Sequence, residues 1–217
     1  MQTHHTHLTF HDLSLHRIDF SSATFADSDL LGLPHYAKLL TAGRKRKAEH
    51  LAGRMAAFHA LREQGIPFIP DIGEKGQPQW PAGWYGSISH SADAALAVVA
   101  RQRVGIDIET RLEADLCEEI ADSIAGPDEL TRLRDSRLPF PLALTLAFSA
   151  KESLYKALSD RFRDIPGFHA AQVSAITPHS LTLELRVDLF PSPAGTAFTL
   201  YWYSENNHVI TLLMAGE

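Results

Sequence analysis

The chain has 217 residues, of which 45% are hydrophobic and 21% charged, and its formal net charge is −6 at pH 7. This length suits one domain or two small ones with a substantial core, and the acidic balance argues against a general nucleic-acid-binding protein. A single cysteine, Cys117, excludes an internal disulfide and is typical of a reducing compartment. No apolar run approaches the roughly 20 residues of a membrane span, so we expect a cytoplasmic protein.

The first ten residues, MQTHHTHLTF, contain three histidines but no basic region followed by an apolar one. They therefore do not resemble a secretory signal. The histidines could bind a metal loosely, but a mobile polar terminus is the prediction.

A basic amphipathic helix is predicted from Arg44 to Gly65. Its hydrophobic residues recur at spacings of three and four, as helix periodicity requires, at Ala48, Leu51, Met55, Phe58 and Leu61. The helix opens with four consecutive cations, RKRK. Four adjacent cations point around a helix and can form a solvated face. The alternative is that they bind an anionic, phosphate-rich ligand.

Prolines and glycines dominate the segment from Ile66 to Gly86, which predicts a long loop with a functional role. Three strands are predicted after it, at Ser87–His90, Ala94–Ala100 and Val104–Glu109.

The third of these strands, VGIDIE, carries two carboxylates two residues apart. Asp107 and Glu109 should point to one face of the strand, with Ile106 and Ile108 on the other. A solvated outer face of a sheet explains this pattern. A site for a hard divalent cation, which takes oxygen ligands, explains it as well.

The second half of the chain is predicted to repeat the order of helix and then sheet. The segment from Arg111 to Pro141 suggests one short helix flanked by loops, and Leu142–Leu158 suggests a longer helix. Three strands are expected after it, near Leu181–Val187, Ala197–Tyr203 and His208–Met214.

The longer helix contains the sequence FSAKESLYKAL, in which Glu152 and Lys156 lie four residues apart on one helical face. An ordinary ion pair along the helix explains this spacing, and Ser149 with Glu152 also matches a capping box. A functional reading requires Glu152 to join Asp107 and Glu109 around Mg²⁺. The side chains of Lys151 and Lys156 would then neutralise charge on a phosphate.

The sequence SISHS, from residue 87 to 91, lies at a strand end. Its hydroxyls, imidazole and backbone N–H groups could bind a phosphate. Alternatively, His90 is an ordinary turn residue.

Taken in order, the sequences SISHS, VGIDIE and FSAKESLYK resemble the 4′-phosphopantetheinyl transferases of the surfactin-synthetase-activating type. The likeness is strong from Arg44 to Phe168 and looser in the C-terminal strands. It implies an α+β fold of two pseudo-symmetric halves, 1–110 and 111–217, each with a helix packed on a small antiparallel sheet and with coenzyme A between them. It also implies that a serine hydroxyl of an apo carrier protein attacks the β-phosphate of coenzyme A, so that phosphopantetheine is transferred and adenosine 3′,5′-bisphosphate leaves.

The resemblance also implies the roles of single residues. Asp107, Glu109 and Glu152 would hold Mg²⁺, and Glu152 would accept the serine proton directly or through a water molecule. The transferring phosphate would be contacted by Lys156, with Lys151 assisting. The residues implied to bind the nucleotide are Arg46, Arg54, Lys75, Ser89 and His90. Of these, Lys75 departs from the family pattern, because Gly76 and Gln77 separate it from Pro78.

The implied partners are coenzyme A and the apo aryl and peptidyl carrier domains of nonribosomal peptide synthetases, as in enterobactin-type siderophore biosynthesis. The segment 111–141 would meet the carrier, and the chain would act as a monomer, with peripheral association with a membrane-bound assembly left open.

Two alternative functions remain: a Mg²⁺-dependent phosphohydrolase acting on coenzyme A or a related nucleotide, and a non-catalytic sensor of such a ligand. Substitution of Asp107 or Glu152 by alanine distinguishes a transferase from a sensor. A transferase should lose turnover with its fold intact, whereas a protein that only binds the ligand does not need these carboxylates.

Overall fold

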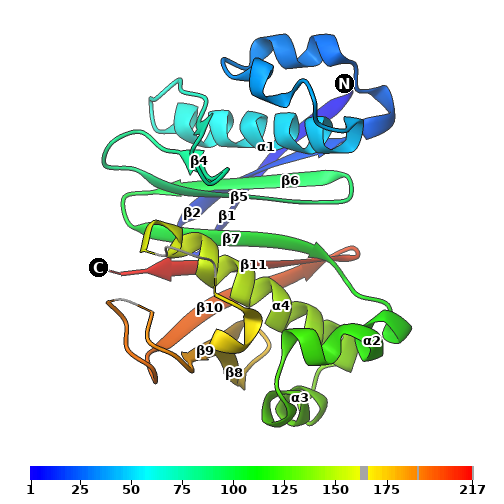
Figure 1. The fold of residues 1–217 in the computed structure, drawn as a ribbon, viewed down its shortest axis with the longest axis vertical. Helices are drawn as coiled ribbons and strands as arrows, with labels where there is room; N and C mark the ends of the chain where they lie inside the picture. Colours follow the sequence, from blue (N-terminus) through cyan, green and yellow to red (C-terminus); the bar gives the residue numbers. More distant parts are fainter. Residues whose placement is uncertain (162–165, 190, 217) are drawn as a thin grey trace. The chain divides into compact units, whose positions relative to one another are not determined.

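The computed structural model describes residues 1–161, 166–189 and 191–216. The chain divides into two compact units, Met1–Val104 and Gly105–Glu217. Each unit contains a sheet with a long helix packed on it, which confirms the predicted α+β class (Figure 1). Within the described residues, no helix is both long and apolar enough to cross a membrane.

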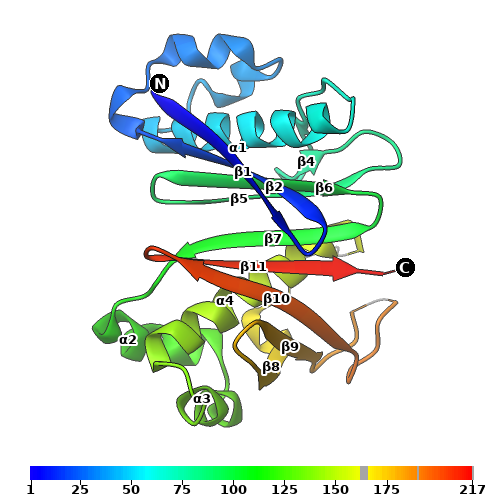
Figure 2. The ribbon, with the colours of Figure 1, turned by 180° about the vertical axis from the view of Figure 1, so that it is seen from behind.

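The first unit is built on a four-stranded antiparallel sheet with the strand order β1-β2-β6-β5. These strands are β1 (Thr3–Phe10), β2 (Leu13–Phe20), β5 (Tyr85–Ser91) and β6 (Ala94–Ala100). A long helix, α1 (Arg44–Glu63), lies along one face of the sheet, as opposite views show (Figures 1 and 2). The remaining elements are short: η1 (Ser22–Thr24), η2 (Asp27–Gly32), η3 (Tyr36–Leu39), β3 (Asp71–Ile72) and β4 (Pro78–Gln79).

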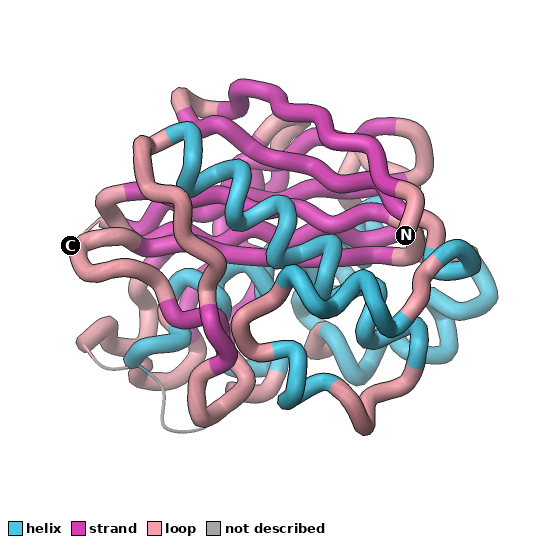
Figure 3. Tube along the Cα trace, turned by 90° about the horizontal axis from the view of Figure 1, so that it is seen from above, coloured by secondary structure: helices cyan, strands magenta, loops and turns pink. Residues whose placement is uncertain are grey.

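The N-terminal segment forms a strand, so the predicted mobile terminus is wrong. Strand β1 pairs with β2 over its whole length, and strand structure begins beside the N-terminus in Figure 3. The two strands are joined by His11 and Asp12, both with positive φ, which is typical of a two-residue type I′ turn. β1 is an edge strand, and most of its side chains are exposed. Its sequence therefore lacks the apolar alternation from which a strand is predicted.

Helix α1 confirms the amphipathic helix predicted from Arg44. Its buried face consists largely of small residues, among them Ala48, Ala52 and Ala56, which pack with Ala95 and Ala97 of β6. Small side chains on both surfaces let the helix and the sheet approach closely, and this packing holds the polar residues of α1 at set positions above the sheet.

The second unit contains a five-stranded sheet with the order β7-β11-β10-β9-β8. Its strands are β7 (Arg103–Thr110), β8 (Ala171–Ile176), β9 (Ser180–Leu185), β10 (Ala197–Glu205) and β11 (His208–Ala215). Helix α4 (Phe140–Ala157) packs on this sheet, and its buried leucines and alanines form most of the helical side of the core. The boundary between the units falls inside β7, so Asp107 and Glu109 belong to the second unit.

Two further helices, α2 (Ala114–Ile124) and α3 (Pro127–Arg134), pack against α4. The prediction of one short helix between 111 and 141 is therefore incomplete, because α3 is present but α2 precedes it. The apolar stripe of α2 is short: its buried residues are Cys117, Ala121 and Ile124. Strand β8 was also not predicted. The 3₁₀ turns of this unit are η4 (Ser159–Arg161) and η5 (Phe168–Ala170).

Candidate functional site

The two acidic motifs of the sequence meet in the second unit. Asp107, in the middle of β7, is only 1% exposed and accepts a hydrogen bond of 2.6 Å from Nζ of Lys156 on α4. Glu109 on β7 and Glu152 on α4 are half-buried. Burial of Asp107 rules out the solvated outer sheet face as an explanation of the D-x-E pattern.

Helix α4 approaches β7 closely at Gly105. A Cβ atom built at Gly105 would lie 1.8 Å from the backbone oxygen of Ser153 on α4, so no larger residue fits without a shift of the helix. Successive side chains of a strand point to opposite faces of the sheet. Gly105, Asp107 and Glu109 are two residues apart and therefore share the face that α4 covers. The missing side chain at Gly105 thus lets the carboxylates of β7 and the polar residues of α4 come together.

Three buried hydroxyls set the position of α4 along the sheet. Oγ1 of Thr211 on β11 is 2.9 Å from Oγ of Ser149 and 2.8 Å from Oγ of Ser153, and Oγ of Ser153 also donates to the backbone oxygen of Thr211. Because Ser149 lies in the interior of α4, the capping-box explanation of its spacing from Glu152 is wrong. The hydroxyls instead hold the helix in register, so that Lys156 reaches Asp107.

The clustered carboxylates perturb one another. Burial, followed by the charge of Asp107, raises the pKa of Glu109 to about 8, while Lys156 opposes this shift. Burial also raises the pKa of Glu152; Lys156 opposes that shift and Asp107 adds to it. A carboxylate in this setting holds a proton more readily than usual, or it needs a further cation nearby.

The donor chemistry of this cluster fits Mg²⁺, which prefers oxygen ligands and is usually held by one or two carboxylates together with substrate phosphates and water. The carboxylate cluster does not by itself supply a complete set of metal ligands. In the part of the chain that the structure describes, no three or more His, Cys, Asp or Glu side chains are arranged to hold a metal ion.

Lys151, by contrast, is fully buried and directed toward α2 and α3. Its Nζ donates to the backbone oxygen of Ile124 at 2.8 Å and to Oε2 of Glu129 at 2.9 Å, and burial lowers its pKa. The other carboxylate oxygen of Glu129 accepts the backbone N–H of Val173 on β8. Lys151 and Glu129 therefore link α4 to α2, α3 and β8. The structure does not bring Lys151 to Asp107.

In the first unit, the four cations that open α1 have different partners. Arg44 donates to backbone carbonyls of the segment before the helix, and Lys47 pairs with Asp27 at 3.0 Å. Lys45 is largely exposed. Arg46 is placed beside a predicted site residue, with its guanidinium 3.1 Å from Nε2 of His90 on β5.

Arg54 lies two turns further along α1 from Arg46 and is 5% exposed. One guanidinium nitrogen donates to the backbone oxygen of Asp71 at 3.3 Å, and Nε has no hydrogen-bond partner among the described residues. Burial, followed by the charge of Arg46, lowers the pKa of Arg54 to about 10 despite the opposing charge of Asp71. A buried guanidinium with spare donors is suited to an anion.

Two residues beside these cations were not singled out from the sequence. Glu49 places a carboxylate oxygen 3.8 Å from Nδ1 of His90. His50 lies between Arg46 and Arg54 on the helix and contacts His35, Nε2 to Nε2 at 2.8 Å; burial, and then Arg54, lower its pKa to about 3. The polar residues at 46, 50 and 54 are spaced by about one helical turn, so this spacing could have identified His50 from the sequence.

The structure separates the side chains of Ser89 and His90. Ile88 faces α1, because a Cβ atom built at Gly53 would lie 2.8 Å from it. By alternation His90 shares that face and the buried Ser89 points to the other one. Lys75 lies in the exposed turn between β3 and β4, where its backbone N–H donates to the side chain of Gln77.

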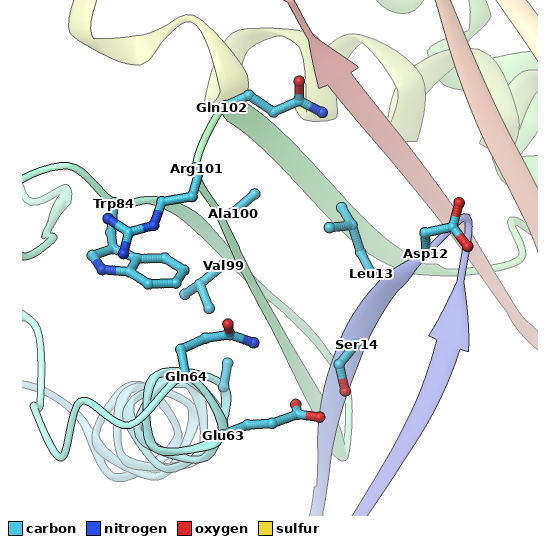
Figure 4. Close-up of a pocket in the computed structure, with 11 residues that line it drawn as sticks. Asp12, Leu13, Ser14, Glu63, Gln64, Trp84, Val99, Ala100, Arg101 and Gln102 are labelled. Carbon is cyan, nitrogen blue, oxygen red and sulfur yellow. The ribbon is translucent and has the colours of Figure 1, made fainter.

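A cavity of about 710 Å³ in the first unit lies beside the end of α1. Figure 4 shows Trp84 with Arg101 on one side, Glu63 and Gln64 at the helix end, and Asp12 with Ser14 on the hairpin. The guanidinium of Arg101 stacks 3.8 Å from the ring centre of Trp84. None of the residues proposed from the sequence lines this cavity.

Comparisons with known proteins cover nearly the whole chain. Residues 35–100 match the family model described as 4′-phosphopantetheinyl transferase N-terminal domain, and residues 103–213 match the one described as 4′-phosphopantetheinyl transferase superfamily. The chain is 51% identical over 215 residues to enterobactin synthase component D of Salmonella typhimurium, covering 99% of this chain and 92% of that protein. It is 47% identical to the protein of the same name from Escherichia coli K12, covering 98% of both chains.

A more distant relative covers less of the chain. The 4′-phosphopantetheinyl transferase PptT of Mycobacterium tuberculosis is 35% identical over 154 residues, which are 67% of this chain and 66% of that protein. None of these three relatives is named as a phosphohydrolase or as a non-catalytic sensor, so they do not support those two alternatives. The similarity over nearly the full length and the two matching family models show that the chain belongs to the 4′-phosphopantetheinyl transferase superfamily.

Proposed function

We propose that this protein transfers 4′-phosphopantetheine from coenzyme A to a serine of apo aryl and peptidyl carrier domains of nonribosomal peptide synthetases, in siderophore biosynthesis of the enterobactin type. The observation that carries the proposal is the ion pair of the buried Asp107 with the partly exposed Lys156, flanked by two carboxylates with raised pKa values, in a chain of this family. The names of its relatives support the choice of pathway. The order of its motifs supports the surfactin-synthetase-activating type.

We assign Asp107, Glu109 and Glu152 to Mg²⁺. The oxygen donors and the raised pKa values of Glu109 and Glu152 support this assignment, because a divalent cation would relieve the repulsion among them. Bound there, Mg²⁺ would neutralise charge on the pyrophosphate of coenzyme A.

Lys156 is assigned to the transferring phosphate, where its ammonium would stabilise developing negative charge. Glu152 is assigned as the group that accepts the serine proton, directly or through a water molecule. Burial raises its pKa, which makes its carboxylate a stronger proton acceptor than an exposed one.

The nucleotide phosphates are assigned to Arg46, Arg54 and His90 of the first unit. The contact between Arg46 and His90 and the spare donor of the buried Arg54 support an anion site. Ser89 would take part through its backbone, because its side chain points to the other face of β5. Lys75 would add a positive charge beside the adenine. Lys151 is left out of this set, since its Nζ donates to two buried protein groups.

We further propose that the protein acts in the cytoplasm as a monomer, without nucleic acid, with residues 1–110 contributing nucleotide contacts and 111–217 contributing carrier contacts. The buried free thiol of Cys117 supports a reducing compartment.

The test is intact-mass analysis of an apo aryl carrier domain incubated with this protein, coenzyme A and Mg²⁺, with a parallel sample containing EDTA. A mass increase of one phosphopantetheine, seen only with metal, is the expected result. Consumption of coenzyme A without modification of the carrier would instead indicate hydrolysis. No change with either aryl or peptidyl carriers would overturn the proposal.

A further inference from the structure

A cluster of histidines in the first unit has no part in the proposed transfer. His5 and His7 lie two residues apart on β1 and so share one face, and His7 is paired with His16 across the hairpin. His59 and Glu63 lie one turn apart at the end of α1. These five side chains, together with Arg62, line a cavity of about 310 Å³.

The imidazole rings of this cluster are in close contact. Nε2 of His5 is 3.0 Å from Nδ1 of His16, and the ring centres of His5 and His59 are 3.8 Å apart in a nearly parallel stack. The ring of His7 lies 5.8 Å from that of His16. Four imidazoles from three separate elements therefore occupy one small volume.

A carboxylate orients the central ring. Nε2 of His16 is 2.6 Å from Oε2 of Glu63, while Figure 4 shows the carboxyl end of Glu63 directed toward Ser14. A carboxylate at Nε2 favours the tautomer with its proton there and leaves the lone pair of Nδ1 available, as in the carboxylate–histidine–metal arrangement of many metal sites.

We propose that His5, His16, His59 and His7 form a binding site for one transition-metal ion, with Zn²⁺ as its representative, and that Glu63 orients His16 within it. Two nitrogens bound to a tetrahedral Zn²⁺ lie about 3.3 Å apart, so the 3.0 Å between His5 and His16 needs only a small opening. Imidazole ligands select Zn²⁺, Cu²⁺ or Ni²⁺ and not Mg²⁺.

The site is incomplete in the arrangement that the structure describes, where no three such side chains converge as ligands. Completion requires rotation of His59 or His7 toward the first two nitrogens. His5 and His7 are exposed on an edge strand, so these side chains can turn, and an ion can enter, without unfolding the sheet.

Calorimetric titration of the full chain with ZnCl₂, in buffer without Mg²⁺ or coenzyme A, tests this proposal. We expect one Zn²⁺ per chain. The variants His5→Gln and His16→Gln should each lose at least about tenfold in affinity, and Glu63→Gln should lose about 10- to 100-fold. The matched control is His179→Gln, an exposed histidine in the second unit, which should bind as the unchanged chain does.

Absence of Zn²⁺ binding, or equal affinity in His5→Gln and the control, would overturn the proposal. His16 is buried and its variant could be poorly folded. His5 is exposed on the edge strand, so His5→Gln should fold normally and its Zn²⁺ affinity decides the test. Circular dichroism checks the folding of both variants. The titration uses no carrier protein, so its result is independent of the proposed transfer.

Discussion

Nζ of Lys156, near the end of α4, lies 2.6 Å from Oδ1 of Asp107, in the middle of β7 and 49 residues earlier in the chain. A buried carboxylate is stable in its charged form only when a cation or hydrogen-bond donors compensate it. The pair thus joins the two acidic motifs and gives the carboxylate cluster its geometry.

Replacement of Asp107 should remove transfer while leaving the fold intact. Asp107→Ala deletes a proposed Mg²⁺ ligand and the partner of Lys156, and we expect a loss of at least about 100-fold in kcat/KM, as for loss of one transition-state contact. The carrier modification assay measures this loss, with circular dichroism as the check of structure. Glu184→Ala, which removes a strand carboxylate on β9, is the control and should retain activity. Full activity of Asp107→Ala would refute the metal assignment.

Gly105→Ala should displace α4 from β7. The added methyl group would meet the backbone oxygen of Ser153, which cannot rotate away. We expect a loss of about 1–3 kcal/mol in the free energy of unfolding, together with loss of activity. Urea denaturation measures the first and the carrier assay the second. Gly32→Ala introduces the same change into open space and should be nearly neutral. Equal behaviour of both variants would contradict the close approach of helix and strand.

Glu109 should make the protein less stable as the pH rises. Its pKa is raised from 4.5 to about 8, so between these values the folded chain holds a proton that the unfolded chain has released. Its contribution to stability is therefore present at low pH and is lost as the pH approaches 8. Glu109→Gln removes this dependence, so the Tm of the variant minus that of the unchanged chain should be larger at pH 9 than at pH 5, without Mg²⁺. A difference that is the same at both values would exclude the raised pKa.

Mg²⁺ should raise the stability of the folded chain by offsetting the repulsion among the clustered carboxylates. An ion that binds the folded chain and not the unfolded chain raises its stability by mass action. At pH 8 we expect Mg²⁺ to raise the Tm of the unchanged chain, and to raise that of Glu109→Gln by less. Thermal unfolding with and without the metal measures both. The same increase in the two proteins would show that Glu109 does not contribute to the metal site.

Lys151 should prove to be structural. Lys151→Met leaves the buried carboxylate of Glu129 without its cation, and breaking a buried pair in this way costs about 3–5 kcal/mol. Urea denaturation measures the loss, and the double variant Lys151→Met/Glu129→Leu should recover much of it. The control, Lys45→Met, alters a lysine whose side chain is 76% exposed. Normal stability of Lys151→Met with a raised KM for coenzyme A would instead support the phosphate contact implied by family resemblance.

His90 should act on the nucleotide and not on the chemical step. His90→Ala removes the ring beside Arg46, and we expect a rise of about tenfold in KM for coenzyme A, as for loss of one charge-assisted hydrogen bond. The same variant should change KM for 3′-dephospho-coenzyme A little. Steady-state kinetics with both substrates decide the point, because equal effects would refute assignment to the 3′-phosphate.

The first strands show where prediction from sequence fails. β1 is a polar edge strand, and its residues are held by the ladder with β2, so no hydrophobic period marks it. The helix α1 and the strands β6 and β7 were predicted because they bury an apolar face or both faces. The approach of Glu152 to Asp107 and Glu109 was expected from the order of the motifs, whereas the ion pair of Asp107 with Lys156 was not predicted, because no local pattern implies it.

The sequence by itself determined the family, the α+β class, the long helices and the residue types at the carboxylate cluster, because periodicity and motif order are local properties of the chain. Only the tertiary structure decided which charges are buried and what they face. It turned Lys151 toward Glu129 and Lys156 toward Asp107, although both lie on one helix. It also placed four histidines around one cavity. Burial and pairing depend on contacts between residues far apart in the chain, and these exist only after the helices have packed on their sheets.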